Sequence, residues 1–249
     1  MWLVLCDAAD ESALWVHQEL RARGVAPLEL LTADTLALAD YWEHRIAGAQ
    51  ATIRFRIGDV EIAGEGVRGV LNRLYTVPTW HWRSASKADQ EYVQQEMAAF
   101  FLSWLHALPC PVVNRPTPHG LAGRWRPESE WAWLAQKAGL PVAPYRETAR
   151  DGIDETKGEK RLVHPRMPMQ TLIVLGEAVA GAGAPAPVVA ASRRLAELAG
   201  AELLGVDFVA GPAGPWTFAG ATALPYLVPG GPALIDALCA RIGVGSRPA

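Results

Sequence analysis

The chain has 249 residues, of which 50% are apolar and 20% charged, with a formal net charge of −3 at pH 7. This composition is typical of a globular protein with one large or two small domains, and it argues against a basic nucleic-acid-binding surface. Three widely spaced cysteines argue against a disulfide framework and a zinc site. Because no signal peptide or membrane span is recognisable, we expect a cytoplasmic protein.

Strand and helix patterns alternate along the N-terminal part. Continuous apolar runs indicate buried parallel strands, and apolar residues at the helical period indicate helices. In chain order we expect a strand at 2–6, a helix at 12–23, a strand at 26–32, a hairpin at 51–63, a buried strand at 66–75, a helix at 87–107 and a short strand at 111–114. The first strand–helix–strand unit implies a right-handed crossover in an α/β domain.

The C-terminal part predicts helices mixed with antiparallel hairpins. In chain order we expect a helix at 127–138, a charged loop at 149–170, a hairpin at 171–182, a helix at 188–200, a hairpin from 205 to 219 and a last helix at 230–242. The loop has no apolar period and contains prolines, which favours irregular structure.

Common catalytic motifs are absent. The sequence contains no G-x-S-x-G, no H-E-x-x-H, no C-x-x-C and no P-loop. The six histidines have no metal-ligand spacing, and a metal site needs several converging ligands. The motif search therefore names no catalytic residue.

The segment TWHWRS, residues 79–84, combines aromatic and cationic groups. His81 and Arg83 are candidates for stacking on a planar or anionic ligand, because guanidinium groups and aromatic rings both offer flat faces. The alternative is that the two tryptophans only cover the core beneath a long loop.

The segment GRWRPESEW places two arginines before a predicted helix. Arg124 and Arg126 are candidates for binding an anion such as phosphate, because the N–H groups at a helix start are unpaired and the dipole favours negative charge. An ion pair with Glu128 or Glu130 is the alternative.

The order of these elements resembles the ATP-grasp family, in particular RimK-like ligases and peptide-maturing ligases of the microviridin type. The N-terminal resemblance rests on GDVEIAGEGVRGVLNR, QQEMAAFFLSWLHALPCPVVNRP and RWRPESEWAWLAQKAGLPVAP. The C-terminal resemblance rests on TLIVLGEAVAGA and on SRRLAELAGAELLGVDFV followed by GPWTFAGATALPYL, where the family has a pattern such as GVDfv…gp.vfEVNssPgl.

The resemblance implies a fold and a site. It implies a Rossmann-like, pre-ATP-grasp α/β domain over residues 1–115 and a reduced ATP-grasp α+β lobe over 116–249. Residues 149–170 stand where the family has its central lid subdomain. Such enzymes transfer the γ-phosphate of ATP to a carboxylate with the help of magnesium.

Carried over residue by residue, the family's metal site is incomplete. The metal-binding aspartate matches Asp207. With no gap in the alignment, the facing glutamate falls on Ala219 and the asparagine on Ala221. Alanine cannot bind a hard cation, so Asp207 is at most a weak, residual metal ligand. A clamping lysine of the family falls at or near Arg126.

We therefore expect a degenerate, non-ligating ATP-grasp protein without an ATP or magnesium cofactor. Its role would be binding: a protein partner, a peptide or a small molecule. Formation of a homodimer is possible on the sequence alone, and we expect neither nucleic acid nor a membrane as a partner.

Two alternatives stay open. An active carboxylate–amine or ester-forming ligase would use ATP and magnesium with a rewired site formed by Arg126, Asp207 and Lys157 or Lys160. A different enzyme would use the cleft for an anionic ligand, with candidate lining residues Arg73, His81, Arg83, Arg124, Arg126 and His164.

Overall fold

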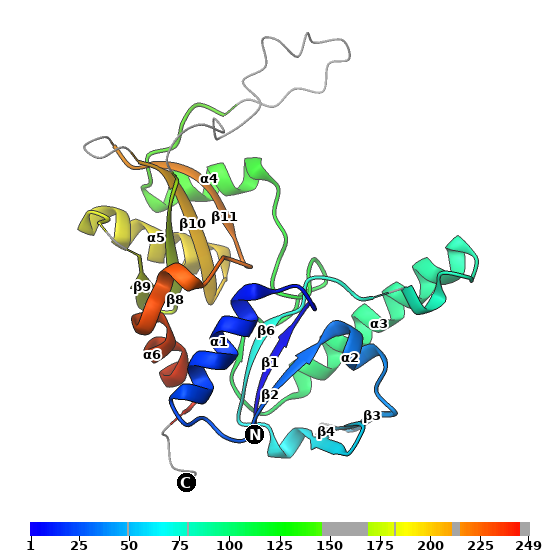
Figure 1. Ribbon diagram of the computed structural model, residues 1–249. Helices are drawn as coiled ribbons and strands as arrows, with labels where there is room; N and C mark the ends of the chain where they lie inside the picture. The colour runs from blue at the N-terminus through cyan, green and yellow to red at the C-terminus, as the bar shows by residue number, and fades with distance from the viewer. Residues whose placement is uncertain (49, 79, 146–168, 182, 211–214, 245–249) are drawn as a thin grey trace. The chain divides into compact units, whose positions relative to one another are not determined.

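The computed structural model describes residues 1–48, 50–78, 80–145, 169–181, 183–210 and 215–244 (Figure 1). The chain forms two compact units: unit 1 is Met1–Arg124 together with Ile235–Ala249, and unit 2 is Trp125–Leu234. The sequence predicted domains at 1–115 and 116–249. The structure differs because the segment after residue 115 is bonded to the first sheet and the last helix returns to unit 1.

A four-stranded parallel sheet forms the centre of unit 1. Its order is β2-β1-β6-β7, with β1 (Trp2–Cys6), β2 (Leu28–Thr32), β6 (Gly69–Arg73) and β7 (Val112–Val113). The helices of this unit are α1 (Glu11–Ala22), α2 (Ala33–Ala37) and α3 (Lys87–Ala107), together with the part of α6 (Gly231–Arg241) from Ile235 onward. Both faces of β1 are buried, which explains its uninterrupted apolar sequence. The predicted α/β domain is thus confirmed.

An antiparallel sheet packs beside α3 in the same unit. It consists of β3 (Tyr41–Ala47), β4 (Gln50–Ile57) and β5 (Val60–Ala63), in the order β3-β4-β5. The ring of Trp42 stacks on Phe55 at 4.3 Å and meets Trp104 of α3 edge-on at 5.2 Å. These rings join the sheet to the helix. The predicted hairpin is present, and β3 and α2 are additional elements.

Helix α6 closes unit 1 against the beginning of the chain. The indole Nε1 of Trp2 donates to the carbonyl of Ile242, just after the helix, at 3.1 Å. Gly69 of β6 lies so close to Ile242 that a Cβ atom on the glycine would be 2.5 Å from its carbonyl oxygen. The glycine is therefore needed for this close approach.

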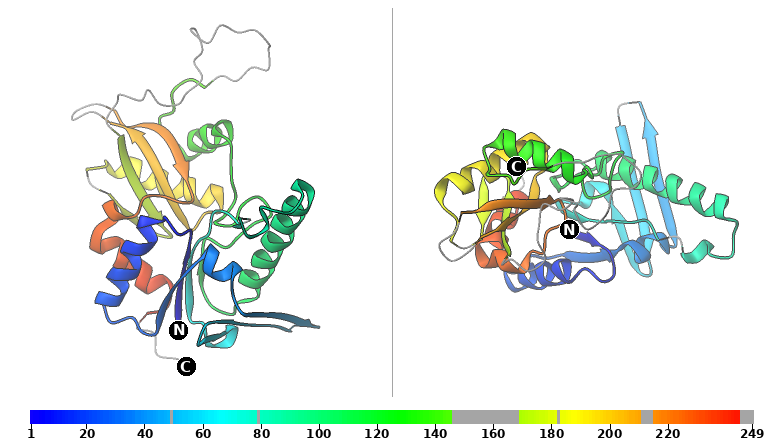
Figure 2. Two further views of the ribbon diagram at one scale, coloured as in Figure 1. Left: turned by 45° about the vertical axis from the view of Figure 1, so that its right-hand side comes forward. Right: turned by 90° about the horizontal axis from the view of Figure 1, so that it is seen from above.

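Unit 2 is an antiparallel sheet with two helices on one face (Figure 2). The sheet order is β11-β10-β8-β9, with β8 (Met169–Leu175), β9 (Ala178–Ala180), β10 (Leu203–Val209) and β11 (Thr217–Thr222). The helices are α4 (Glu128–Ala138) and α5 (Ala186–Ala199). Their apolar residues form one core with alternate residues of the strands.

The described parts of the chain contain no helix with the length and apolarity that a bilayer crossing requires. Of the predicted loop at 149–170, residues 149–168 lie outside the described residues, and the last two belong to β8.

Candidate functional site

Asp207 lies in the middle of β10, on the face of the sheet opposite to α4 and α5. Its neighbours in the sheet are Thr171 on β8 and Gly220 on β11. Directly paired residues in an antiparallel sheet point to the same side, so these three residues share a face. Thr222 of β11 pairs with Gly205, two residues before Asp207, and therefore lies on that face as well.

A β-bulge decides which residues of β11 face Asp207. Phe208 pairs with Phe218, whereas Asp207 pairs with Gly220, so Ala219 is an extra residue in β11. Ala221 pairs with Val206 and packs against the core of unit 2.

The bulge changes the alignment of β11 with the ATP-grasp family pattern. This chain has one residue more between Phe218 and Pro225 than the family pattern, and the bulge accommodates it. Ala221 pairs with Val206 and therefore does not face Asp207, contrary to the expectation, whereas Ala219 is the bulged residue and its match to the family's glutamate stays a prediction. Gly220 and Thr222 occupy that face, because a shift of one residue turns a side chain to the other side of the sheet.

The surroundings of Asp207 favour its neutral form. Burial raises the pKa of its carboxyl group, while a hydrogen bond from Thr171 acts in the opposite direction. In this bond the hydroxyl Oγ1 of Thr171 donates to Oδ1 of Asp207 at 2.6 Å.

The donor set does not fit a magnesium ion. Mg²⁺ prefers octahedral oxygen coordination, normally with carboxylates, and this face offers one carboxylate and the hydroxyls of Thr171 and Thr222. Within the described ranges, no group of three or more His, Cys, Asp or Glu side chains is placed to hold a metal ion. Open space surrounds the position that a Cβ atom on Gly220 would take.

Arg126 links the two helices of unit 2. Its Nε donates to Glu130 at 2.9 Å, and its Nη2 donates to the carbonyl of Ala199 at the end of α5 at 2.6 Å. The guanidinium also lies over the ring of Trp131, 5.2 Å from its centre. The ion pair with Glu130 is the alternative that the sequence left open for this arginine. Anion binding by Arg126 stays a prediction, and it would compete with these contacts.

Arg73 ends β6 and forms a buried ion pair in unit 1. Its Nε and Nη2 donate to the two carboxylate oxygens of Asp10 at 2.7 and 3.1 Å. The side chains are only 5% and 14% exposed. Asp10 also caps α1 by accepting from the N–H of Ala13. Because the charge of Arg73 is compensated, its role as an anion-binding residue stays a prediction.

The remaining candidates belong to both units and to the segment outside the described residues. His81 is half-buried and contacts the ring of Trp82 at 5.8 Å, and Arg83 is exposed. Arg124 is also exposed and ends the first segment of unit 1, while Arg126 belongs to unit 2. His164, Lys157 and Lys160 lie outside the described residues.

Comparison with solved structures gives matches over nearly the whole chain. Macrocyclase MdnC of Microcystis aeruginosa MRC, bound with precursor peptide MdnA, matches with a TM-score of 0.70 and 12% identity, over 97% of this chain and 99% of that one. A RiPP-associated ATP-grasp ligase of Chryseobacterium gregarium, in complex with ADP and a leader and core peptide, matches with a TM-score of 0.70 and 11% identity, over 99% and 97%.

A third structure agrees with these two. ATP-grasp ligase PsnB, complexed with a minimal precursor, matches with a TM-score of 0.65 and 14% identity, over 96% of this chain and 98% of that one. The chain has the ATP-grasp fold. No protein-family model matches this chain, and no curated protein matches it.

Sequence reasoning missed the groups that position the site. The hydroxyl of Thr171 beside Asp207 had no signal, because the two residues are 36 positions apart. The extra residue before Pro225 was a signal for the bulge that a count against the family pattern would have found.

Proposed function

We propose that this chain is a peptide- or partner-binding protein on an ATP-grasp fold that does not itself carry out ATP-dependent ligation. The observation that carries this proposal is the face of β10 and β11, where Asp207 meets Gly220 and Thr222 in place of a glutamate and an asparagine. The solved neighbours bind precursor or leader and core peptides, which supports a peptide as the ligand.

The same proposal includes the finer reading of the fold. Unit 1, with its parallel sheet, corresponds to the Rossmann-like pre-ATP-grasp domain, and unit 2 to a reduced ATP-grasp lobe of the RimK-like type. Residues 149–170 replace the lid subdomain, which in such enzymes excludes water from the phosphates. We place the protein in the cytoplasm.

Nucleotide chemistry tests the proposal directly. Isothermal titration with ATP, with and without Mg²⁺, should show no saturable magnesium-dependent binding, because the described residues that share the face of Asp207, namely Thr171, Gly220 and Thr222, supply no second carboxylate. Release of ADP is measured in parallel with wild type and Asp207→Asn. Magnesium-dependent ADP release by the wild type that Asp207→Asn abolishes would overturn the proposal.

Restoring the family's ligands provides the positive control. The double variant Gly220→Glu, Thr222→Asn places a carboxylate and an amide on the face of Asp207, and there is room for the new side chain at position 220. We expect this variant to bind Mn²⁺ in a titration where the wild type does not. Adding Asp207→Asn to the double variant should weaken the binding again. Equal Mn²⁺ binding by wild type and double variant would contradict the account of this face.

An active ligase with a rewired site is the second candidate. The retention of Asp207 in a half-buried position, with a hydrogen bond from Thr171, favours it. This candidate predicts the opposite result in the same assay: magnesium-dependent ADP release that depends on Asp207.

A further inference from the structure

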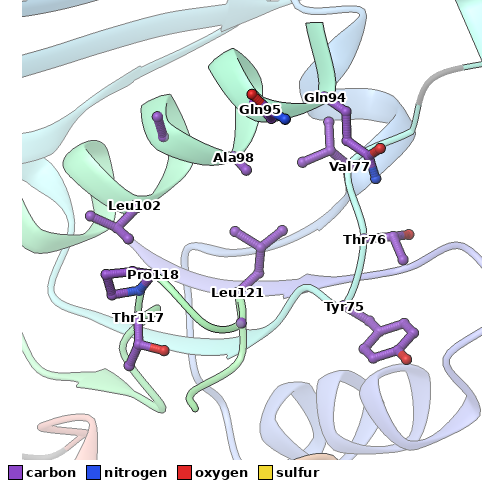
Figure 3. Close-up of a pocket in the computed structure, with 12 residues that line it drawn as sticks. Tyr75, Thr76, Val77, Gln94, Gln95, Ala98, Leu102, Thr117, Pro118 and Leu121 are labelled. Atoms are coloured by element: carbon purple, nitrogen blue, oxygen red, sulfur yellow. The ribbon is translucent and has the colours of Figure 1, made fainter. Parts of the chain in front are cut away.

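A cavity of about 510 Å³ lies in unit 1, beside α3 (Figure 3). We call it the α3 groove. One wall is α3 and the other is made of the segments that follow β6 and β7. The lining residues are Tyr75, Thr76, Val77, Gln94, Gln95, Ala98, Ala99, Leu102, Thr117, Pro118, Gly120 and Leu121. Its volume lies within the range of about 300–1,000 Å³ that is usual for ligand pockets.

The groove lies where open parallel sheets bind ligands. The segments 75–77 and 117–121 follow the carboxyl ends of β6 and β7, two neighbouring strands of the parallel sheet. In open α/β sheets ligands bind outside the carboxyl ends of the strands, most often where the strand order reverses, which here is between β1 and β6. The groove lies at this same end of the sheet, beside β6 and β7, and none of the candidate site residues considered above lines it.

Two polar side chains, the half-buried Asp7 and the buried Asn72, hold the two loop segments in place. The carboxylate of Asp7 accepts hydrogen bonds from the backbone N–H groups of Tyr75 and Thr76. The fully buried amide Nδ2 of Asn72 donates to the carbonyls of Asn114 and Leu121 at 2.8 and 2.7 Å.

The second loop is also closed by its own backbone. The N–H and C=O groups of Thr117 and Gly120 bond to each other at 2.9 and 3.1 Å. The walls are thus fixed by bonds within the chain, and a ligand would meet a preorganised groove, which lowers the entropic cost of binding.

The chemistry of the lining points to an uncharged ligand. Among the described residues that line the groove, none is Asp, Glu, Lys, Arg or His. A charge buried here would lose its hydration without gaining a countercharge. Figure 3 shows Leu102 and Pro118 toward one end, Gln94 and Val77 toward the other, and Leu121 between them. Amide and hydroxyl groups can donate to and accept from a peptide backbone.

The length of the groove limits the size of its ligand. The helical residues from Gln94 to Leu102 span about 12 Å at a rise of about 1.5 Å per residue. An extended peptide covers the same distance with about four residues, at about 3.3 Å each. Ala98 and Ala99, in the middle of this span, let a peptide backbone approach the helix closely.

We propose that the α3 groove binds an uncharged, extended peptide segment of about four residues with bulky apolar side chains. The choice of a peptide rests on the proposed function, while the choice of an uncharged, apolar segment rests on the lining alone. The apolar side chains pack against Leu102 and Leu121, and the amides of Gln94 and Gln95 bond to the backbone.

The test uses the full chain and two blocked tetrapeptides. The first is N-acetylated, C-amidated Leu-Gln-Leu-Phe, and the second has aspartate in place of both leucines. Ala99→Trp places a large side chain in the groove. Ala88→Trp is the matched control, because Ala88 is an exposed alanine of the same helix outside the groove. Dissociation constants are measured by isothermal titration, and circular dichroism verifies that both variants are folded.

We expect wild type and Ala88→Trp to bind the apolar peptide equally well, and Ala99→Trp to bind it at least about tenfold more weakly, a difference of about 1.4 kcal/mol. The acidic peptide should bind wild type at least about tenfold more weakly as well. Absent binding of the apolar peptide, equal binding by both variants, or equal binding of both peptides would each overturn the proposal.

Two further outcomes separate this proposal from others. If sedimentation shows a dimer that Ala99→Trp dissociates and Ala88→Trp does not, the groove is a contact between copies of this chain and the peptide proposal is wrong. If Ala99→Trp still binds the peptide at full strength, the groove is rejected while a peptide-binding function stands. Magnesium-dependent ADP release rejects the proposed function and leaves the groove untouched.

Discussion

The buried ion pair between Asp10 and Arg73 allows a quantitative test of how unit 1 is held together. Asp10→Asn removes the negative charge but keeps an oxygen that can cap α1 at the N–H of Ala13. Because both partners are at most 14% exposed, solvent screens the pair little. Removing one partner of a buried pair typically costs about 3–5 kcal/mol, and we expect a loss of that size.

A second variant separates the two roles of Asp10. Asp10→Ala removes the helix cap together with the charge, and should cost about 1 kcal/mol more than Asp10→Asn. Adding Arg73→Met to Asp10→Asn should recover a large part of the loss, because the guanidinium that needs the carboxylate is then gone. The two single losses should therefore exceed the loss of the double variant.

Urea unfolding, followed by circular dichroism and by tryptophan fluorescence, measures these differences in the free energy of unfolding. The shift is interpreted only if both signals agree and the dependence on urea is unchanged. Glu91→Gln is the control, because the pair of Glu91 with Lys87 is 3.8 Å long and largely exposed, and should contribute little. A loss below about 1 kcal/mol for Asp10→Asn, or strictly additive losses, would refute the reasoning.

Two further variants test the sheet of each unit. Burial raises the pKa of Asp207, so the stability associated with its protonated form is present at low pH and lost as the pH rises through the folded-state pKa. Asp207→Asn, whose amide oxygen still accepts from Thr171, should therefore be more stable than wild type at pH 7 and lose this advantage at about pH 3.5. Thermal melts of both proteins at both pH values measure the difference. A stability advantage of Asp207→Asn that grows toward acid pH would contradict the prediction. Gly69→Ala should lower the free energy of unfolding by about 1–3 kcal/mol, because the new Cβ atom would clash with Ile242. Gly66→Ala is the control and should change it little, because the space around Gly66 is open. Equal urea midpoints for the two variants would contradict the close contact at Gly69.

The sequence predicts regular elements well where local patterns decide the structure. The α3 helix covers residues 87–107 as expected, and the side chain of Ser86 caps it by accepting from the N–H of Asp89. The strand β3, Tyr41–Ala47, was missed because its residues are mostly exposed and carry little apolar signal. A strand that covers a sheet edge is determined by its neighbours rather than by its own composition.

The candidate site was predicted only in part, because register is a property of two strands. Asp207 was located correctly on its strand, but the bulge was not foreseen, so Ala221 was expected to face Asp207 where the structure has Gly220. In the same way, the local sequence was compatible with two roles for Arg126, binding an anion or forming an ion pair with Glu130. The carbonyl of Ala199, 73 positions away, adds to the contacts that hold the guanidinium beside Glu130.

The return of α6 to unit 1 has a consequence for how the protein is made. The hydrogen bond from Trp2 to Ile242 joins residues 240 positions apart, and Gly69 lies so close to Ile242 that a side chain would not fit there. At about 5–20 residues per second, a ribosome needs roughly 10–50 s to synthesise the intervening chain. During that time the ends of β1 and β6 at Trp2 and Gly69 lack their contact with Ile242, while residues 125–234 leave the ribosome as a continuous segment. We therefore expect the second unit to fold during translation and the first to be completed after it.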